Sequence, residues 1–148
     1  MLGKKKEKDP YEEKILGIDY GSANIGLAFG INNLVSPLKV ISGRNTNTAI
    51  SQISRYIIEN KVDKIIMGLP VSVGGKETPM SRKVRRFSKL LKIRTKMPVT
   101  FVSEYRTSEE SITEAINLGV SKKRRRSIDH LSAALIIKEY YSKLPHDY

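Results

Sequence analysis

The feature that most constrains the fold is a succession of short apolar segments that are separated by turn residues. Three such segments lie close together, over residues 15–20, 25–31 and 35–42, and G-S-A-N and N-N stand in the two gaps. Gly, Ser and Asn are typical of tight turns, so the pattern predicts three consecutive antiparallel strands joined by hairpins. The folded part of the chain is therefore expected to begin with a three-stranded meander.

Helical and strand patterns alternate after residue 42. Isoleucines at i, i+3, i+7 and i+8 indicate a helix with one apolar stripe, formed by Ile50, Ile53, Ile57 and Ile58. A buried type of strand follows over 64–68, and residues 71–77, which contain G-G, predict a flexible loop. Thr78 and Pro79 are typical of a helix start, and the buried stripe of this second helix is expected to comprise Met80, Val84, Phe87 and Leu91.

The rest of the chain predicts one more strand and two more helices. The strand is expected over 99–104. Thr107 and Glu110 have the spacing of a capping box for a helix that ends at Gly119, and a strongly apolar helix is expected over 128–141. The order β-β-β-α-β-α-β-α-α predicts an α/β domain with a mixed five-stranded sheet, in which three antiparallel strands precede alternating strands and helices that flank the sheet.

Length and composition limit the domain organisation. Residues 1–14 are polar and mixed in charge, which predicts a mobile N-terminal arm, and residues 15–148 are expected to form a single domain because 148 residues leave little room for a second. The arm lacks the apolar core of a signal peptide, and no run approaches the ~18–20 apolar residues of a membrane span. The absence of cysteine excludes disulfides, thiolate zinc sites and a cysteine nucleophile, and is compatible with the cytoplasmic location that we expect.

The charge of the chain is strongly positive and unevenly distributed. The formal net charge is +12, and residues 76–126 alone hold fifteen basic and five acidic residues. Such a balance favours a polyanionic partner, with nucleic acid the first choice and an acidic membrane surface the second. The excess lies in one internal third of the chain, so it indicates a binding surface on the folded domain.

Three carboxylates stand where catalysis could use them. Asp19 ends the first strand, Glu104 ends the fifth, and Asp129 lies near the start of the last helix. Each also has a structural interpretation: Asp19 could start a turn, Glu104 could be a solvated strand-end carboxylate, and Asp129 could stabilise the positive end of the helix dipole. Strand alternation places Asp19 on the face of Gly17 and Glu104 on the face of Val102.

Metal ions would explain how these acids could come together. Close carboxylates repel one another unless cations hold them, and oxygen ligands without cysteine suit Mg²⁺ or Mn²⁺. Two such ions about 3.5–4 Å apart can bind the attacking water and the leaving oxygen of a phosphodiester. The acids of this basic chain therefore predict a metal-dependent nuclease site.

Basic residues beside these acids are candidates for binding a phosphate backbone. The helix that follows Pro79 carries Arg82, Lys83, Arg85, Arg86 and Lys89, and the run before Asp129 comprises Lys122, Lys123, Arg124, Arg125 and Arg126. Lys76 in the G-G loop is a weaker candidate. The structural alternatives are an ordinary solvated helix face for the first group and a mobile loop for the second.

Four segments together resemble the YqgF/RuvX family of RNase H-like proteins, which are described as Holliday junction resolvases or pre-16S rRNA nucleases. They are I-L-G-I-D-Y-G-S-A-N-I-G-L-A (15–28), I-I-M-G-L-P-V-S-V-G-G-K-E-T-P (65–79), V-T-F-V-S-E-Y-R-T-S-E-E (99–110) and S-I-D-H-L-S-A-A-L-I-I (127–137). The resemblance covers residues 14–141. It implies an RNase H-like fold and a hydrolase that binds Mg²⁺ or Mn²⁺ through Asp19, Glu104 and Asp129.

The resemblance also implies a substrate class. The expected function is hydrolysis of phosphodiester bonds in structured RNA or branched DNA, either at the 5′ end of pre-16S rRNA during ribosome biogenesis or at Holliday junctions. No membrane partner is expected, and the sequence leaves open whether the chain is a monomer or a homodimer.

Three positions depart from the family pattern. S-E-Y at 103–105 replaces the usual D-E-R, so that Arg106 would have to supply the basic group, and Asn24 and Gly74 replace a basic residue and an aspartate. The S-E-Y departure favours, as an alternative, a catalytically weak nucleic-acid-binding factor in rRNA maturation. A third hypothesis comes from G-I-D-Y-G-S, which resembles the phosphate loop of actin-like ATPases and sugar kinases, but those folds need two such domains.

Overall fold

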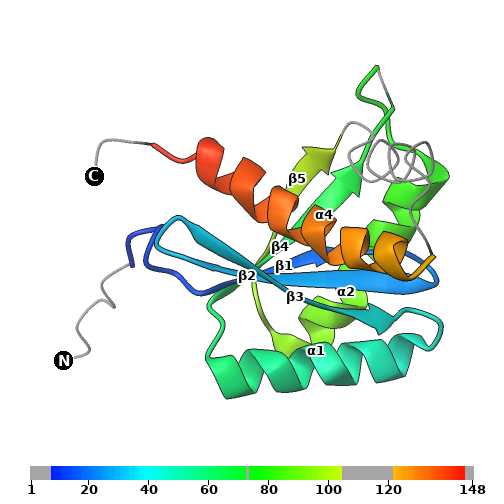
Figure 1. Cartoon of the computed structure of the whole chain (residues 1–148), viewed down its shortest axis with the longest axis horizontal. Helices are drawn as coiled ribbons and strands as arrows, with labels where there is room; N and C mark the ends of the chain where they lie inside the picture. Colours follow the sequence, from blue (N-terminus) through cyan, green and yellow to red (C-terminus); the bar gives the residue numbers. More distant parts are fainter. Residues whose placement is uncertain (1–7, 73, 105–121, 146–148) are drawn as a thin grey trace.

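A mixed five-stranded sheet forms the centre of the molecule (Figure 1). The computed structural model describes residues 8–72, 74–104 and 122–145 of the chain, without the side chains of residues 122–130. The strands are β1 (Ile15–Asp19), β2 (Asn24–Ile31), β3 (Leu34–Ser42), β4 (Lys64–Pro70) and β5 (Val99–Glu104), in the sheet order β3-β2-β1-β4-β5. The helices are α1 (Thr46–Asn60), α2 (Pro79–Thr95) and α4 (Lys122–Ser142).

The strand pairing confirms the predicted meander and mixed sheet. β1 pairs with β2, and β2 with β3, in antiparallel fashion, while β4 runs parallel to both β1 and β5. Asn32 and Asn33 join β2 to β3 with φ angles of 53° and 64°, a conformation that Asn tolerates better than most residues and that matches a tight hairpin turn. β4 lies between β1 and β5, so the two strands that carry Asp19 and Glu104 are not neighbours.

Each face of the sheet is covered by helices (Figure 1). α1 and α2 cover one face, where Ile53, Val84 and Leu91 pack on alternate residues of the strands. α4 crosses the other face, where Ile136 and Ile137 pack with residues such as Ile66. Two layers of helix around one sheet bury both sides of β1 and β4, which explains why these strands are apolar at almost every position.

α4 packs very close to the sheet. A Cβ atom added at Gly17 on β1 would lie 2.6 Å from Cγ1 of Ile137 and 3.0 Å from the backbone oxygen of Ala133. Glycine on the strand and alanine on the helix therefore remove the side chains that would hold the two apart. This agrees with the small residues that follow Asp129 in the sequence.

Some details of the helices differ from the predictions. Ile58 is 74% exposed and Met80 is 36% exposed, so their assignment to buried stripes is wrong, whereas Val84, Phe87 and Leu91 are buried as expected. Ile58 follows Ile57 by 100° around a helix that ends at Asn60, and this rotation takes it out of the contact with the sheet. α4 begins at Lys122 instead of 128, so the basic run is helical. The predicted helix of residues 107–119 lies outside the described residues.

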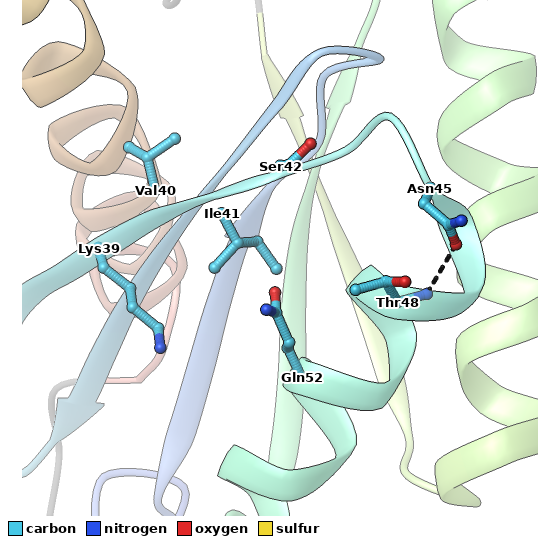
Figure 2. Close-up of a pocket in the computed structure, with 7 residues that line it drawn as sticks. All are labelled: Lys39, Val40, Ile41, Ser42, Asn45, Thr48 and Gln52. Atoms are coloured by element: carbon cyan, nitrogen blue, oxygen red, sulfur yellow. Dashed lines mark hydrogen bonds between the residues drawn. The ribbon is translucent and has the colours of Figure 1, made fainter.

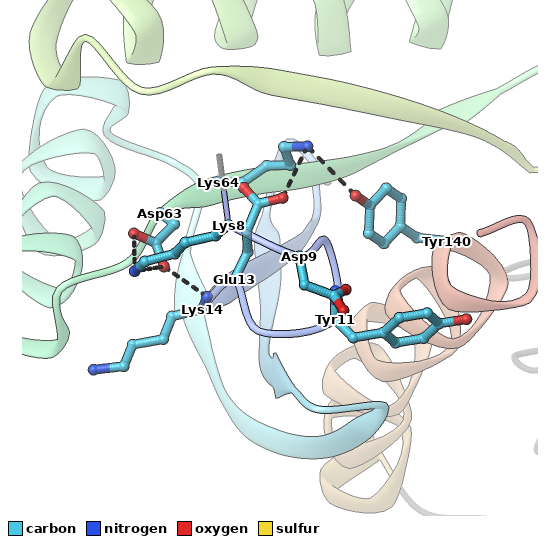
Figure 3. A network of polar contacts seen from close by, with 8 residues as sticks. All are labelled: Lys8, Asp9, Tyr11, Glu13, Lys14, Asp63, Lys64 and Tyr140. Carbon is cyan, nitrogen blue, oxygen red and sulfur yellow. Dashed lines mark hydrogen bonds and ion pairs between the residues drawn. The ribbon is translucent and has the colours of Figure 1, made fainter. Parts of the chain in front are cut away.

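The segment before β1 is held against the rest of the molecule (Figure 3). Asp63 accepts hydrogen bonds from the Lys14 backbone N–H (2.8 Å) and from Nζ of Lys8 (3.1 Å). The ring of Tyr11 stacks on Tyr141 of α4, with the centroids 5.7 Å apart. Residues 8–14 thus make defined contacts, and the mobility of the arm in solution stays a prediction. Within the described residues, no helix has the length and hydropathy needed to cross a bilayer.

Candidate active site

Asp19 and Glu104 lie on the same face of the sheet, the face that α4 covers. Their neighbours confirm the predicted alternation: Tyr20 packs on Phe87 of α2 on the opposite face, with ring centroids 4.7 Å apart, while Val102 belongs to the cluster under α4. β1 and β5 both end here, with only β4 between them. The two carboxylates are close enough for the negative charge of Asp19 to act on Glu104.

Glu104 is buried, although strand ends usually leave a carboxylate in water. Its exposed fraction is only 8%, so the interpretation as a solvated strand-end carboxylate is wrong. Oε1 is buried and has no hydrogen-bond partner among the described residues. Burial, and to a lesser extent the charge of Asp19, raise the pKa of Glu104 from 4.5 to about 8. A buried carboxyl group with an unpartnered oxygen beside a second carboxylate is costly for the fold alone and typical of a functional site.

Gly68 on β4 belongs to this site, and sequence reasoning missed it. A Cβ atom placed on Gly68 would lie 2.6 Å from Cδ of the Glu104 carboxyl group and would also meet its Oε2. The carboxyl group therefore leans from β5 over the backbone of β4. The signal was present in K-I-I-M-G-L-P, because strand alternation puts Gly68 on the α4 face, but only the sheet order shows which side chain occupies the space.

The third predicted acid, Asp129, has a side chain outside the described residues. Its position in the chain is nevertheless informative, because α4 begins at Lys122 and Asp129 is therefore about two turns inside the helix. The helix dipole acts mainly on the first turn, so the interpretation of Asp129 as a residue that stabilises the helix start is wrong. The basic run Lys122–Arg126 forms the start of the same helix. Its side chains, like that of Asp129, are not among those that the structure describes.

The donor set at this edge suits a hard divalent cation. Within the described residues no three His, Cys, Asp or Glu side chains gather closely enough to hold a metal, and the pair Asp19 and Glu104 supplies two carboxylates. The unpartnered Oε1 of Glu104 is a free acceptor beside Asp19. Two carboxylates that offer oxygen only fit Mg²⁺ or Mn²⁺.

The predicted basic residues of α2 are exposed to solvent. The first turn of α2 is anchored at the end of β4, because the Ser81 hydroxyl donates to the backbone oxygen of Pro70, and Pro70 stands opposite Glu104 in the sheet. Beyond this first turn the helix presents a series of exposed basic side chains, namely Arg82, Lys83, Arg85, Arg86 and Lys89. Arg106 lies outside the described residues.

Arg85 differs from the other basic residues of α2. Its Nε donates to Oε1 of Glu77 in an ion pair, and its guanidinium lies over the ring of Phe101 on β5, 5.2 Å from the centroid. No such ion pair is found for Arg82 or Arg86 within the described part of the chain. Arg85 is thus held by internal partners, which weakens the case for it as a phosphate ligand.

The chain between β4 and α2 folds back on itself beside Glu104. Val71 donates its N–H to the backbone oxygen of Glu104 at 3.1 Å and bridges Glu77, and the Ser72 N–H donates to the backbone oxygen of Lys76 at 2.9 Å. The described residues of this segment project beyond the end of the sheet (Figure 1). Lys76 is therefore exposed at the same edge as the two carboxylates.

A separate cavity of about 320 Å³ lies between β3 and α1 (Figure 2). Lys39, Ile41 and Ser42 of β3 and Thr48 and Gln52 of α1 line it. Since α1 covers the face opposite to α4, this cavity is not part of the carboxylate site.

Comparison with known proteins identifies the relatives of the chain. The curated relative from Mycoplasma mobile is 33% identical over 84% of this chain and 89% of its own length, and its name is "Putative pre-16S rRNA nuclease". Relatives of the same name come from Oleidesulfovibrio alaskensis (31% identical; 90% of this chain and 94% of the relative) and Chloroflexus aggregans (32%; 87% and 93%).

Solved structures confirm the fold. RuvC of Thermus thermophilus superimposes with a TM-score of 0.54 over 88% of this chain and 95% of the RuvC chain, at 13% sequence identity, in a complex with a Holliday junction substrate. The sheet order and the helices on both faces are those of an RNase H-like domain, as predicted. The family model described as "RuvX: Holliday junction resolvase" matches residues 13–143, and the chain therefore belongs to the RuvX family.

Proposed function

We propose that the protein is a metal-dependent nuclease that hydrolyses phosphodiester bonds in structured nucleic acid. The observation that carries this proposal is the buried Glu104 carboxyl, which has an unpartnered Oε1 and lies beside Asp19 at the carboxyl ends of parallel strands. A protein does not gain stability from such a pair, so a ligand that needs both acids is the simplest reason for it. A divalent cation meets that need.

The roles of the residues follow from their positions. Asp19 and Glu104 would hold Mg²⁺ or Mn²⁺, and Asp129 would complete the ligand set. Ala133 and Ile136, which follow Asp129 by four and seven residues, are buried in the contact with the sheet, and helical periodicity places residue 129 on the same side of α4. When bound, the cation would activate water and neutralise charge in the transition state.

The basic residues would position the substrate. The exposed Lys76, Arg82, Arg86 and Lys89 start at the edge where the carboxylates lie, and we propose that they follow a phosphate backbone across α2 together with Lys122–Arg126 and Arg106. Each phosphate that they neutralise releases counterions, so binding should weaken steeply with salt. This surface has no sequence preference of its own, which suits a substrate that is recognised by its shape.

The proposed substrate is the precursor of 16S rRNA, cleaved near its 5′ end in the cytoplasm during ribosome biogenesis. The names of the curated relatives, which match most of the chain, support RNA. The description of the family supports a four-way DNA junction as the second candidate. Because a symmetric junction has two equivalent cleavage points, DNA cleavage would require a dimer, whereas processing of one rRNA end would not.

A cleavage panel tests the nuclease proposal. Precursor rRNA, a four-way junction and single strands are incubated with the wild type and with Asp19→Asn and Glu104→Gln, in Mg²⁺, Mn²⁺ or chelator. We expect metal-dependent cleavage of the precursor rRNA by the wild type, and a loss of at least about 100-fold in both variants, because each removes a metal ligand.

The matched control is Glu139→Gln, which neutralises an exposed carboxylate on α4 whose ion pair, among the described residues, is with Lys143. This variant should cleave like the wild type. Equal residual cleavage by the wild type and Asp19→Asn would contradict the nuclease proposal. If the wild type then still bound precursor rRNA tightly, the alternative of a catalytically weak binding factor, which the S-E-Y departure favours, would replace it.

A further inference from the structure

We propose that Gly68 is a positioning residue for Glu104: by lacking a side chain, it provides the space in which the carboxyl group of Glu104 lies beside Asp19. This inference rests on the proposed role of Glu104 as a metal ligand and adds a residue that the donor chemistry alone does not indicate. Gly68 has no side chain that could bind a metal or a phosphate, so the effect of a side chain added there should act through Glu104.

The sheet order places Gly68 between the two acids. β4 is the strand between β1 and β5, and Ile18 pairs with Met67, so Gly68 is level with Asp19 on one side. On the other side Gly68 pairs with Val102, two residues before Glu104, and the three residues 19, 68 and 104 share the α4 face. A carboxyl group from β5 that approaches Asp19 must therefore pass over position 68.

The space over Gly68 is filled on two sides. A Cβ atom there would meet Oε2 of Glu104, would lie 2.6 Å from its Cδ, and would lie 2.7 Å from Cδ1 of Ile136 on α4. Carbon atoms in contact are normally about 3.5–4.0 Å apart, so a single added methyl group cannot be accommodated without movement. The carboxyl group of Glu104 and the side chain of Ile136 therefore occupy the space that a side chain at position 68 would need.

The movement would fall on the side chains and not on the backbone. All three close atoms belong to the ends of flexible side chains, and the backbone of β4 or α4 is not among them. Rotation of Glu104 about its side-chain bonds can relieve the contact, and the fold can survive. The carboxyl group would then leave its position beside Asp19, and the pair could no longer bind one cation together.

The test compares Mn²⁺ binding by the full chain with and without the added methyl group. For Gly68→Ala we expect a Mn²⁺ dissociation constant, measured by calorimetry on chelator-treated protein, that is raised about tenfold or more, which is the effect typical of residues that orient metal ligands. With saturating Mn²⁺, kcat for precursor rRNA should fall while KM stays within about twofold, because the basic surface is unchanged. Cooperative thermal unfolding should be retained.

Ile136→Val separates the two contacts of the added methyl group. Valine lacks Cδ1, so the double variant Gly68→Ala/Ile136→Val removes the contact with α4 and keeps the contact with Glu104. The inference predicts weak Mn²⁺ binding in the double variant and normal binding in Ile136→Val alone. Normal Mn²⁺ binding by the double variant would overturn the inference, because Gly68 would then serve only the packing of α4.

The remaining outcomes also decide the question. If neither Gly68 variant unfolds cooperatively, glycine is required for packing and the inference is wrong. If Gly68→Ala binds Mn²⁺ normally while Asp19→Asn does not, the metal site stands and only the positioning role fails. If the wild type and Asp19→Asn bind Mn²⁺ equally weakly, the proposed function fails first and the inference fails with it. Gly74→Ala, where a Cβ atom meets nothing within 4 Å, is the control for an added methyl group.

Discussion

At the scale of one residue, Glu104 shows how a residue of a functional site can lower the stability of the folded protein. Its carboxyl group is buried, Oε1 has no partner among the described residues, and its pKa is raised to about 8. In the folded protein the group therefore holds its proton more tightly than in the unfolded chain. In the absence of metal, Glu104 therefore costs stability increasingly as the pH rises from 4.5, and the cost is largest above pH 8.

Replacement of this residue should consequently stabilise the metal-free protein. The contribution of Glu104 to the free energy of unfolding is largest below its ordinary pKa of 4.5 and declines as the pH rises to about 8. Glu104→Gln lacks this decline, so at pH 7 in chelator it should be more stable than the wild type by roughly 1–3 kcal/mol. Urea unfolding at pH 5 and pH 8 measures the difference.

Added Mn²⁺ should reverse the order of the two proteins. The cation binds the folded wild type and stabilises it by mass action, whereas Glu104→Gln should gain little. Glu139→Gln should follow the wild type under every condition. If metal-free Glu104→Gln were less stable than the wild type at pH 8, burial of the Glu104 carboxylate would not be what destabilises the fold, whatever the activity of the variant.

At the scale of one element, α2 combines a structural and a binding role. Thr78 and Ser81 form a capping box at its start, and Ser81 also ties the helix to Pro70 at the end of β4. The helix buries Val84, Phe87 and Leu91 toward the sheet and presents its basic residues to solvent. Because the same few contacts fix the first turn and the end of β4, the basic face is aligned with the strand ends that carry the acids.

The basic residues of α2 should not contribute equally to nucleic-acid binding. Arg82→Gln and Arg86→Gln should each lower the slope of log affinity against log salt by about 1, because each removes one phosphate contact. Arg85→Gln should change the slope less, since Glu77 and Phe101 already hold its guanidinium. Fluorescence anisotropy with labelled precursor rRNA at several salt concentrations, in the Asp19→Asn background, measures the slopes.

Arg55→Gln is the control for simple loss of charge. Arg55 is exposed in the second half of α1, which leads to the start of β4 and not to the strand ends that carry the acids, and its replacement should leave the slope nearly unchanged. If Arg85→Gln and Arg82→Gln lowered the slope equally, the ion pair between Arg85 and Glu77 would have to open when a phosphate binds. The assignment of Arg85 to an internal role would then be wrong.

At the scale of the whole molecule, residues 8–14 join parts that are distant in the sequence. Asp63, just before β4, binds Lys8 and Lys14, while Lys64 pairs with Glu13 at 3.6 Å (Figure 3). Tyr11 stacks on Tyr141 near the end of α4. Residues 8–14 thus connect the start of β4 to the C-terminal end of α4.

Loss of Asp63 should weaken the fold in a pH-dependent way. Burial tends to raise the pKa of Asp63, but hydrogen bonds from the Lys14 backbone and from Lys8 outweigh it, so the pKa is lowered. Its stabilisation is therefore present above the ordinary value of 3.8 and is lost as the pH falls through the lower folded value. Asp63→Asn should reduce the free energy of unfolding by about 1 kcal/mol at pH 7 and by less below pH 3.

Chemical denaturation at the two pH values checks this. Glu139→Gln again serves as the control, because its partner Lys143 directly follows the end of the same helix and joins no distant elements. If the wild type and Asp63→Asn differed in free energy of unfolding by the same amount at both pH values, the charge of Asp63 would not contribute to stability. Only the shape of the side chain would then matter.

Much of the fold could be predicted because it depends on local patterns. The turn residues around 21–24 and 32–33 predicted the meander, and the period of two placed Asp19 and Glu104 on the faces where the structure has them. Helical periodicity identified Val84, Phe87 and Leu91 as buried. It failed for Ile58 and Met80, because an apolar residue at the margin of a stripe is buried only if a neighbouring element reaches it.

The sequence by itself determined which residues are acids or bases and on which face of its own strand or helix each one lies, because backbone geometry sets these within a few residues. Only the tertiary structure decided that β4 lies between β1 and β5, that Glu104 is buried beside Asp19, and that Gly68 leaves the space for its carboxyl group. These facts depend on the order of strands that are distant in the chain. Burial and the electrostatic effect of one carboxylate on another are set by such non-local neighbours, and no local pattern specifies them.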